Sequence, residues 1–330
     1  MFRRVFIKNS LAVASTSILS MNLASAQEKW QAKKPIKFIV PAPPGSTPDA
    51  TARPLAEKLS EDLGQAVVVE NRPGAGGVIG MESVIRSAPD GYTIGLATQS
   101  QMVFNPFLFE KLPYEISKDV QPITRIASLA LVLAANPSLG VSSLRELIAL
   151  AKARVNNPIQ IGVPLLGTPP HVISLLIQNE LGIKLDTVPF KGTAEAVAAC
   201  RSGDVSLVLE APPAIIPHAK DGKLKVLAVT GSSREPQIPD TPTVSEVAGK
   251  LVPGETWFGL IAPMGVPAEI VSQYQRSISL ALAKPELKSL YANFSWRVIE
   301  KSSPQEFNSV IRDESNQWGQ IIRRTGIKLG

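Results

Sequence analysis

The stretch that decides the fold runs from residue 36 to residue 64, IKFIVPAPPGSTPDATARPLAEKLSEDLG, from an apolar strand through a turn into an amphipathic helix. The turn is rich in Gly, Pro, Ser and Thr. Because Pro54 removes one hydrogen bond, the regular helix is expected to begin near Thr51, and it should stop at Gly64. One face of this helix carries apolar residues at helical spacing: Ala52, Leu55, Ala56, Leu59 and Leu63.

The same alternation of apolar strands and helical segments continues along the chain, with strands expected at residues 66–70, 92–97, 129–135, 158–163, 185–190, 205–209 and 224–229. This β–α order predicts an α/β protein with parallel sheets covered by helices. A chain of 330 residues with 44% hydrophobic residues is long enough for two lobes. The chain is expected to cross between them near residues 126–130 and 250–256.

Two further helices have clear starting signals. Ser143 with Glu146 and Ser303 with Glu306 have the spacing of capping boxes, and Pro304 follows the second serine at the first helical position. Both helices are therefore predicted with definite N-termini.

Residues 1–26 read as a signal peptide, with a basic start, an apolar middle from Leu11 to Leu23 and an Ala24-Ser25-Ala26 cleavage site. The start also resembles a twin-arginine signal, so that route and the general secretory route both stay open. The apolar run is too short for a membrane anchor. Removal of the peptide lowers the net charge from +6 to +3, leaving 31 basic and 28 acidic residues.

The remaining charges form no basic run, so nucleic-acid binding is not expected. The single cysteine, Cys200, lies at an apolar helical position without a partner for an internal disulfide. It is predicted to be a small buried hydrophobic residue.

Phosphate and dinucleotide motifs are incomplete. No lysine follows Gly45 until Lys58, which excludes a nucleotide P-loop. A second turn has glycines at 74, 76, 77 and 80, which is not the G-x-G-x-x-G spacing. The second turn is therefore interpreted as a tight turn packed beneath a helix.

Catalytic and metal-binding patterns are also missing. The sequence has no G-x-S-x-G elbow, and its two histidines, His171 and His218, have no metal-ligand spacing. The sequence therefore predicts no enzyme activity, no metal and no cofactor.

Two strand-to-helix turns can bind an anion through backbone amides and short hydroxyls. The first contains Gly45, Ser46 and Thr47, and the second contains Gly167 and Thr168. Facing each other across a cleft, they would hold a carboxylate without catalytic residues. The alternative is that these residues serve only backbone conformation and helix capping.

Several segments spread over the chain resemble the Bug family, the extracytoplasmic solute-binding receptors of tripartite tricarboxylate transporters. They include VPAPPGSTPDATARPLAEKL (40–59), GQAVVVENRPGAGGVIG (64–80), SAPDGYTI (87–94), VPFKGTAEAV (188–197) and TWFGLIAPMGVP (256–267). The resemblance covers nearly the whole mature chain.

The resemblance implies a two-lobe periplasmic binding protein, type II-like, with a hinge and an interlobe ligand cleft. Residues 27–128 and 252–330 would form the first lobe and residues 129–251 the second. It further implies a small organic carboxylate as ligand, membrane permease subunits as partners and a periplasmic location. A hinged receptor of this kind is expected to be monomeric.

The resemblance also implies the ligand-binding residues, which come from two first-lobe segments and two second-lobe segments. Asp49 is expected to brace the helix start, since like charges repel. Glu210 is an acidic cleft residue that would receive an ammonium or hydroxyl group, or brace a neighbouring loop. The predicted site is Ala42, Pro44, Gly45, Ser46, Thr47, Asp49, Thr98, Gln99, Ser100, Leu166, Gly167, Thr168, His171 and Glu210.

Two departures from the family pattern bear on the ligand. Ala42 replaces a usually aromatic residue, and the second-lobe turn reads Val163-Pro164-Leu165-Leu166-Gly167 in place of Ser, Gly and Asn. Polar donors are lost and apolar surface is gained. The hypothesis is a bulkier, less polar carboxylate, such as an aromatic acid or a longer dicarboxylate, and not citrate or an amino acid.

Two rival functions remain open at this point. A periplasmic hydrolase or isomerase on the same scaffold would need a nucleophile and base, for which His171 beside Thr168 is the arrangement to test. A ligand-sensing subunit for a membrane kinase would share every feature of a transport receptor.

Overall fold

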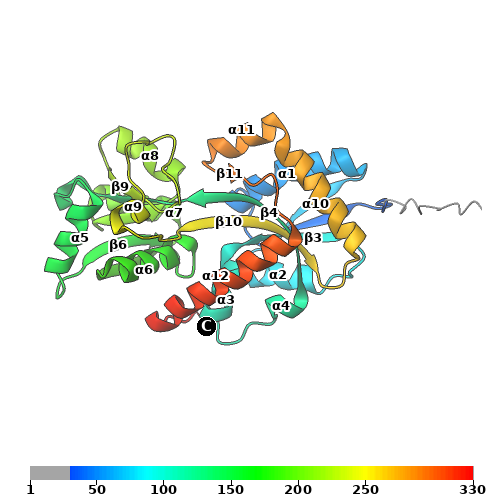
Figure 1. The fold of residues 1–330 in the computed structure, drawn as a ribbon, viewed down its shortest axis with the longest axis horizontal. Coiled ribbons are helices and arrows are strands. Elements are labelled where there is room, and N and C mark those ends of the chain that lie inside the picture. The colour runs from blue at the N-terminus through cyan, green and yellow to red at the C-terminus, as the bar shows by residue number, and fades with distance from the viewer. Residues whose placement is uncertain (1–29, 330) are drawn as a thin grey trace, which may run out of the picture.

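The protein has two lobes that lie side by side, each with a central sheet flanked by helices (Figure 1). A computed structural model describes residues 30–329. The predicted signal peptide, residues 1–26, lies outside this range. No helix within the described range is both long and apolar enough to cross a membrane.

The first lobe contains a six-stranded mixed sheet. Strands β1 and β2 are parallel, as are β1 and β3, whereas β10 runs antiparallel to both β3 and β4. The prediction of a purely parallel sheet is therefore wrong here. In spatial order the strands are β11 (Arg297–Val298), β4 (Val120–Ala130), β10 (Glu255–Pro263), β3 (Thr93–Thr98), β1 (Ile36–Val40) and β2 (Val67–Asn71).

The second lobe contains a five-stranded sheet that is also mixed. Strand β6 is parallel to β7 and β8, while β5 is antiparallel to β8 and β9. In spatial order the strands are β7 (Leu185–Phe190), β6 (Ile159–Pro164), β8 (Leu207–Glu210), β5 (Val132–Ala135) and β9 (Lys225–Val229).

Helices cover the sheets of both lobes (Figure 1). Those before β4 or after β10 are α1 (Thr47–Leu63), η1 (Ala75–Gly77), α2 (Val78–Ile85), η2 (Ser100–Phe104), α3 (Asn105–Leu108), α4 (Ile116–Asp119), α10 (Ala268–Ala283), α11 (Pro285–Asn293) and α12 (Pro304–Thr325). Those between β5 and β10 are η3 (Pro137–Leu139), α5 (Leu144–Ala153), α6 (Pro169–Leu181), α7 (Thr193–Ser202), α8 (Pro212–Lys220) and α9 (Val244–Ala248).

The chain passes between the sheets twice. It leaves the first sheet at Ala130, the end of β4, and enters the second at Val132, the start of β5. It leaves the second sheet after β9 and returns to the first at Glu255, the start of β10. Strands β4 and β10 pair with each other at the crossing. The exact division into lobes made from the sequence stays a prediction.

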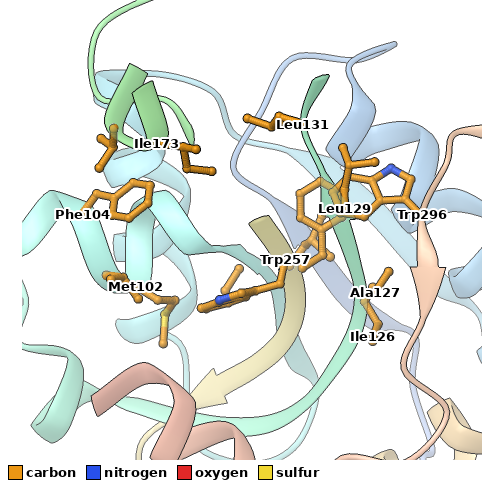
Figure 2. Packing of buried hydrophobic residues seen from close by; sticks show 14 of the residues in the cluster. Met102, Phe104, Ile126, Ala127, Leu129, Leu131, Ile173, Trp257 and Trp296 are labelled. Atoms are coloured by element: carbon orange, nitrogen blue, oxygen red, sulfur yellow. The ribbon is translucent and has the colours of Figure 1, made fainter. Parts of the chain in front are cut away.

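One continuous hydrophobic core spans both lobes, and Figure 2 shows part of it around Leu129, Leu131, Trp257 and Trp296. A second cluster covers the other face of the second sheet, because alternate residues of β5 point to opposite faces. This second cluster contains Cys200, whose thiol is free and whose pKa burial raises to about 12. The prediction of a buried small hydrophobic residue is confirmed.

Helix α1 begins at Thr47, not near Thr51, and runs through Pro54 to Leu63. Gly64 caps its C-terminus and has the left-handed backbone conformation. The predicted start near Thr51 was wrong. Pro48 lies in the first turn of the helix, where the N–H group that proline lacks would have no partner within the helix. The lost bond at Pro54 is tolerated because packing of the apolar face contributes most of a helix's stability. That face buries Leu55 and Leu59 completely.

The two predicted helix starts are observed with one difference. Ser303 and Glu306 form both bonds of a capping box. Ser143 accepts from the Glu146 amide, but the Glu146 carboxylate bonds instead to the amide of Ser142, at 2.7 Å. A third capping box, Thr243 with Glu246, was not predicted.

Candidate functional site

A cleft of about 880 Å³ lies between the lobes and is lined by residues of both. The carboxyl ends of three strands reach it, at Thr98 of β3, Pro164 of β6 and Glu210 of β8. This is the edge at which open α/β sheets bind ligands.

Within the described part of the chain, five helices of eight or more residues begin at this cleft. Its lining includes the first or capping residues of α1 (Thr47), α2 (Gly77), α6 (Thr168), α7 (Thr193) and α8 (Ala211). Each helix start presents unpaired amide groups and the positive end of a dipole. The arrangement therefore favours an anion.

Side-chain charge contributes little to this preference. Among the described residues that line the cleft, Glu210 is the one charged side chain, and none is Lys or Arg. An anion in the cleft would be bound by backbone amides and hydroxyl groups, not by an ion pair.

In the first lobe, the turn before α1 is held by Asp49. The Gly45 amide, with φ at 75°, donates to Asp49 Oδ2 at 2.8 Å. Burial disfavours the charge on Asp49, but bonds from Arg53, Gly45 and Asn71 outweigh it and lower the pKa. The carboxylate of Asp49 is thus engaged in bracing the turn.

In the second lobe, the turn before α6 is held in the same way by His171. The Gly167 amide, with φ at 78°, donates to His171 Nδ1 at 3.0 Å. Asp49 and His171 are each the third residue of their helix, four residues after the glycine. A glycine followed four residues later by an acceptor at a helix start is the sequence signal for this brace.

Burial lowers the pKa of His171 from its ordinary value of 6.5 to about 4. As the pH falls, His171 is therefore protonated at a higher pH in the unfolded chain than in the folded protein. The free energy of unfolding decreases as the pH drops below 6.5. The variant His171→Asn keeps an acceptor for Gly167 and serves as the reference. Between pH 7 and pH 4, the unfolding free energy of the wild type should fall by about 3 kcal/mol more than that of the variant.

Urea unfolding of both proteins at each pH measures this difference, and carboxylate titrations common to both cancel. A constant difference between pH 7 and pH 4 would show that His171 is not buried in its neutral form.

The structure brings together nine of the fourteen predicted site residues. Those that line the cleft are Ala42, Ser46, Thr47, Thr98, Ser100, Leu166, Gly167, Thr168 and Glu210. Pro44, Gly45, Asp49, Gln99 and His171 are not among the lining residues. That any of them contacts a ligand stays a prediction.

Gln99 differs from its neighbours Thr98 and Ser100, which line the cleft. Its side chain is fully buried and donates to Glu314 Oε2 at 2.8 Å, an oxygen that also accepts from Trp257 Nε1. This network borders a separate cavity of about 180 Å³. Gln99 therefore ties the end of β3 to α12 and the crossing strand β10.

An aromatic wall in the cleft was missed by sequence reasoning. Phe258 of β10 and Trp296 stack with ring centroids 4.2 Å apart and planes 31° apart, and Phe109 also lines the cleft. These residues are far apart in the sequence and follow no shared pattern. The glycine turn of residues 74–77, which the sequence analysis interpreted as structural, lines the cleft as well.

Backbone strain also gathers at the cleft. Between residues 30 and 329, three non-glycine residues have positive φ: Ala75 (46°) and Leu165 (61°), which line the cleft, and Ser295 (57°), which precedes Trp296. Such conformations cost of order 1 kcal/mol or more and cluster at functional sites. Leu165 is 52% exposed, so little burial offsets its strain.

Comparison with known proteins identifies the family. The profile described as "Tripartite tricarboxylate transporter family receptor" matches residues 51–327. The chain belongs to this family. The chain is also 36% identical over 298 residues to Protein BugT of Bordetella pertussis, covering 90% of each chain.

Solved structures of other periplasmic binding proteins have the same fold as this chain. The periplasmic binding protein BugD matches with a TM-score of 0.75 and 29% identity, over 90% of this chain and 99% of the other. The R. palustris protein Rpa4515, solved with adipate, matches with a TM-score of 0.77 and 28% identity, over 90% and 98% of the two chains. The fold is that of a two-lobe periplasmic binding protein, as the sequence resemblance implied.

Proposed function

We propose that the protein is a periplasmic receptor that binds a small organic carboxylate between its lobes and delivers it to membrane permease subunits. Family membership supports the transport role, and the adipate in Rpa4515 supports a carboxylate as ligand. Binding and lobe closure are then linked, because the two lobes contact the ligand together only when closed.

The observation that supports the proposal most strongly is the start of α1. Pro48 has no N–H, so Thr47 and Asp49 carry the free amides of the first turn, while the Gly45 amide is engaged with Asp49. The braced turn presents these donors to a cleft that, within residues 30–329, is lined by no Lys or Arg. A carboxylate fits such a set of fixed donors.

The shape and polarity of the lining favour an apolar ligand body. The hypothesis of a bulkier, less polar ligand was based on Ala42 and Leu165. Both residues line the cleft, and so does the Phe258–Trp296 pair. A highly hydroxylated ligand would leave hydroxyl groups unpaired here, each at a cost of about 1–3 kcal/mol.

The arrangement of Thr168 and His171 does not favour catalysis. Thr168 Oγ1 bonds to the carbonyl oxygens of Pro164 (2.8 Å) and Leu165 (2.9 Å), and His171 Nδ1 accepts from Gly167. Neither residue activates the other, as a nucleophile and base must. The protein is therefore proposed to bind its ligand unchanged.

A thermal-shift screen of residues 27–330 tests the proposal. Aromatic acids, aliphatic dicarboxylates, citrate and acidic amino acids would be compared at equal concentration. A ligand at 100 times its dissociation constant should stabilise the protein by about 2.7 kcal/mol, and we expect this from carboxylates with an apolar body.

Stabilisation by citrate or amino acids alone would keep the receptor function but remove the argument from the apolar lining. No stabilisation by any carboxylate would contradict the proposed function.

A further inference from the structure

Glu210 occupies the second-lobe side of the cleft, between the starts of α7 and α8. It is 4% exposed and lies at the end of β8. Its Oε1 accepts from Thr193 Oγ1 at 3.0 Å, and its Oε2 accepts from the Ala211 amide at 2.8 Å. Both partners also line the cleft, so the carboxyl group is fixed at its wall.

The neighbouring helix starts differ in their amide donors. Helices α6 and α8 each begin with two prolines, at 169–170 and 212–213, which lack N–H groups. Helix α7 begins with Thr193 and Ala194, so of these three helices it has the fuller set of first-turn amides. The carboxyl group of Glu210 is bonded to the side chain of the first residue of α7.

Among the residues that the structure describes, no Lys or Arg lines the cleft, so none of them places a cation beside Glu210 at the cleft surface. Burial raises the pKa of Glu210, while the bonds from Ala211 and Thr193 act in the opposite direction. A second anion beside this carboxyl group would meet like charge in a poorly solvated place. Such a contact discriminates between ligands by repulsion.

From this geometry we propose that Glu210 makes the receptor selective for monocarboxylates. Its carboxyl group takes the position beside α7 that the second carboxylate of a diacid would need. The ligand carboxylate then binds at the start of α1, and its other end, next to Glu210, is uncharged or a hydrogen-bond donor. This inference rests on the proposed carboxylate function and narrows it.

Calorimetric titration of residues 27–330 with two matched pairs tests the inference: hexanoate against adipate, and benzoate against terephthalate. Within each pair the acids differ only in the distal group. In the pair that binds more tightly, the wild type should prefer the monoacid at least ten-fold. Glu210→Gln, which keeps the shape and removes the charge, should reduce the preference to less than about three-fold by strengthening diacid binding.

The matched control is Glu195→Gln, which removes one negative charge from α7. Glu195 does not line the cleft, so the preference should be unchanged. A wild type that binds the diacid as tightly as the monoacid would overturn the inference, whether or not the variant folds. An unchanged ratio in folded Glu210→Gln would also overturn it. Failure of all four acids to bind would instead count against the carboxylate function itself.

Discussion

Replacing Thr47 by proline is expected to weaken carboxylate binding by about 10- to 100-fold while leaving the fold intact. The change deletes one amide donor at the first helical position of α1. A hydrogen bond to a charged group contributes about 1.5–3 kcal/mol, which gives that range of affinity.

The protein itself shows that such a helix start is compatible with the fold. Helices α6 and α8 both begin with two prolines, as α1 would in the variant. The capping residue Ser46 has φ −74° and ψ 165°, close to the −78° and 160° of Thr168 before α6. These extended values are the ones that a following proline requires.

Thr47→Val is the matched control, because it keeps the amide and the branched shape and loses only the hydroxyl. Calorimetric titration of both variants with the tightest-binding carboxylate from the screen separates the contribution of the Thr47 amide from that of its hydroxyl group. Equal affinities for the proline and valine variants would show that the amide of Thr47 does not bind the ligand.

Gly80→Ala is expected to destabilise the protein by about 2 kcal/mol. A Cβ at position 80 of α2 would lie 2.6 Å from the Cα and Cβ of Pro41 and 2.9 Å from the carbonyl oxygen of Arg72. Both contacts involve the backbone or a rigid ring, so α2 must move away from the end of β1. Overpacking of this kind costs about 1–3 kcal/mol or more, which exceeds the roughly 1 kcal/mol that alanine gains in a helix.

Urea unfolding measures this loss, with Gly64→Ala as control. Gly64, unlike Gly80, has a positive φ, and it has no atom within 4 Å of an added Cβ, so its cost should stay near 1 kcal/mol. Because Pro41 lines the cleft, Gly80→Ala should also weaken ligand binding. Equal destabilisation by the two variants would contradict the close packing of α2 against the turn.

The position of the two glycine turns at the cleft could be predicted from the sequence because their signals are local. A strand, a glycine and a helix start follow one another within about ten residues in both lobes, so Ser46, Thr47, Gly167 and Thr168 were correctly placed together at one cleft. Local signals also identified the helix starts at Ser143 and Ser303.

The features of the fold and the cleft that could not be predicted depend on contacts between segments that are distant in the sequence. Whether Gln99 faces the cleft or the core is decided by Glu314, 215 residues further along the chain. The stacking of Phe258 on Trp296 requires β10 and the segment beside β11 to meet through β4. Strand β10 was not predicted at all, and most of β4 was missed. Their antiparallel pairing is set by chain topology and not by residue pattern.

The most direct test of carboxylate binding at α1 is a crystal structure of residues 27–330 with the tightest carboxylate from the screen. We predict that the carboxylate oxygens lie about 2.7–3.2 Å from amide nitrogens in the first turn of α1, with the ligand body against Phe258 and Trp296. A carboxylate bound elsewhere, with the start of α1 left free, would contradict the proposed binding mode.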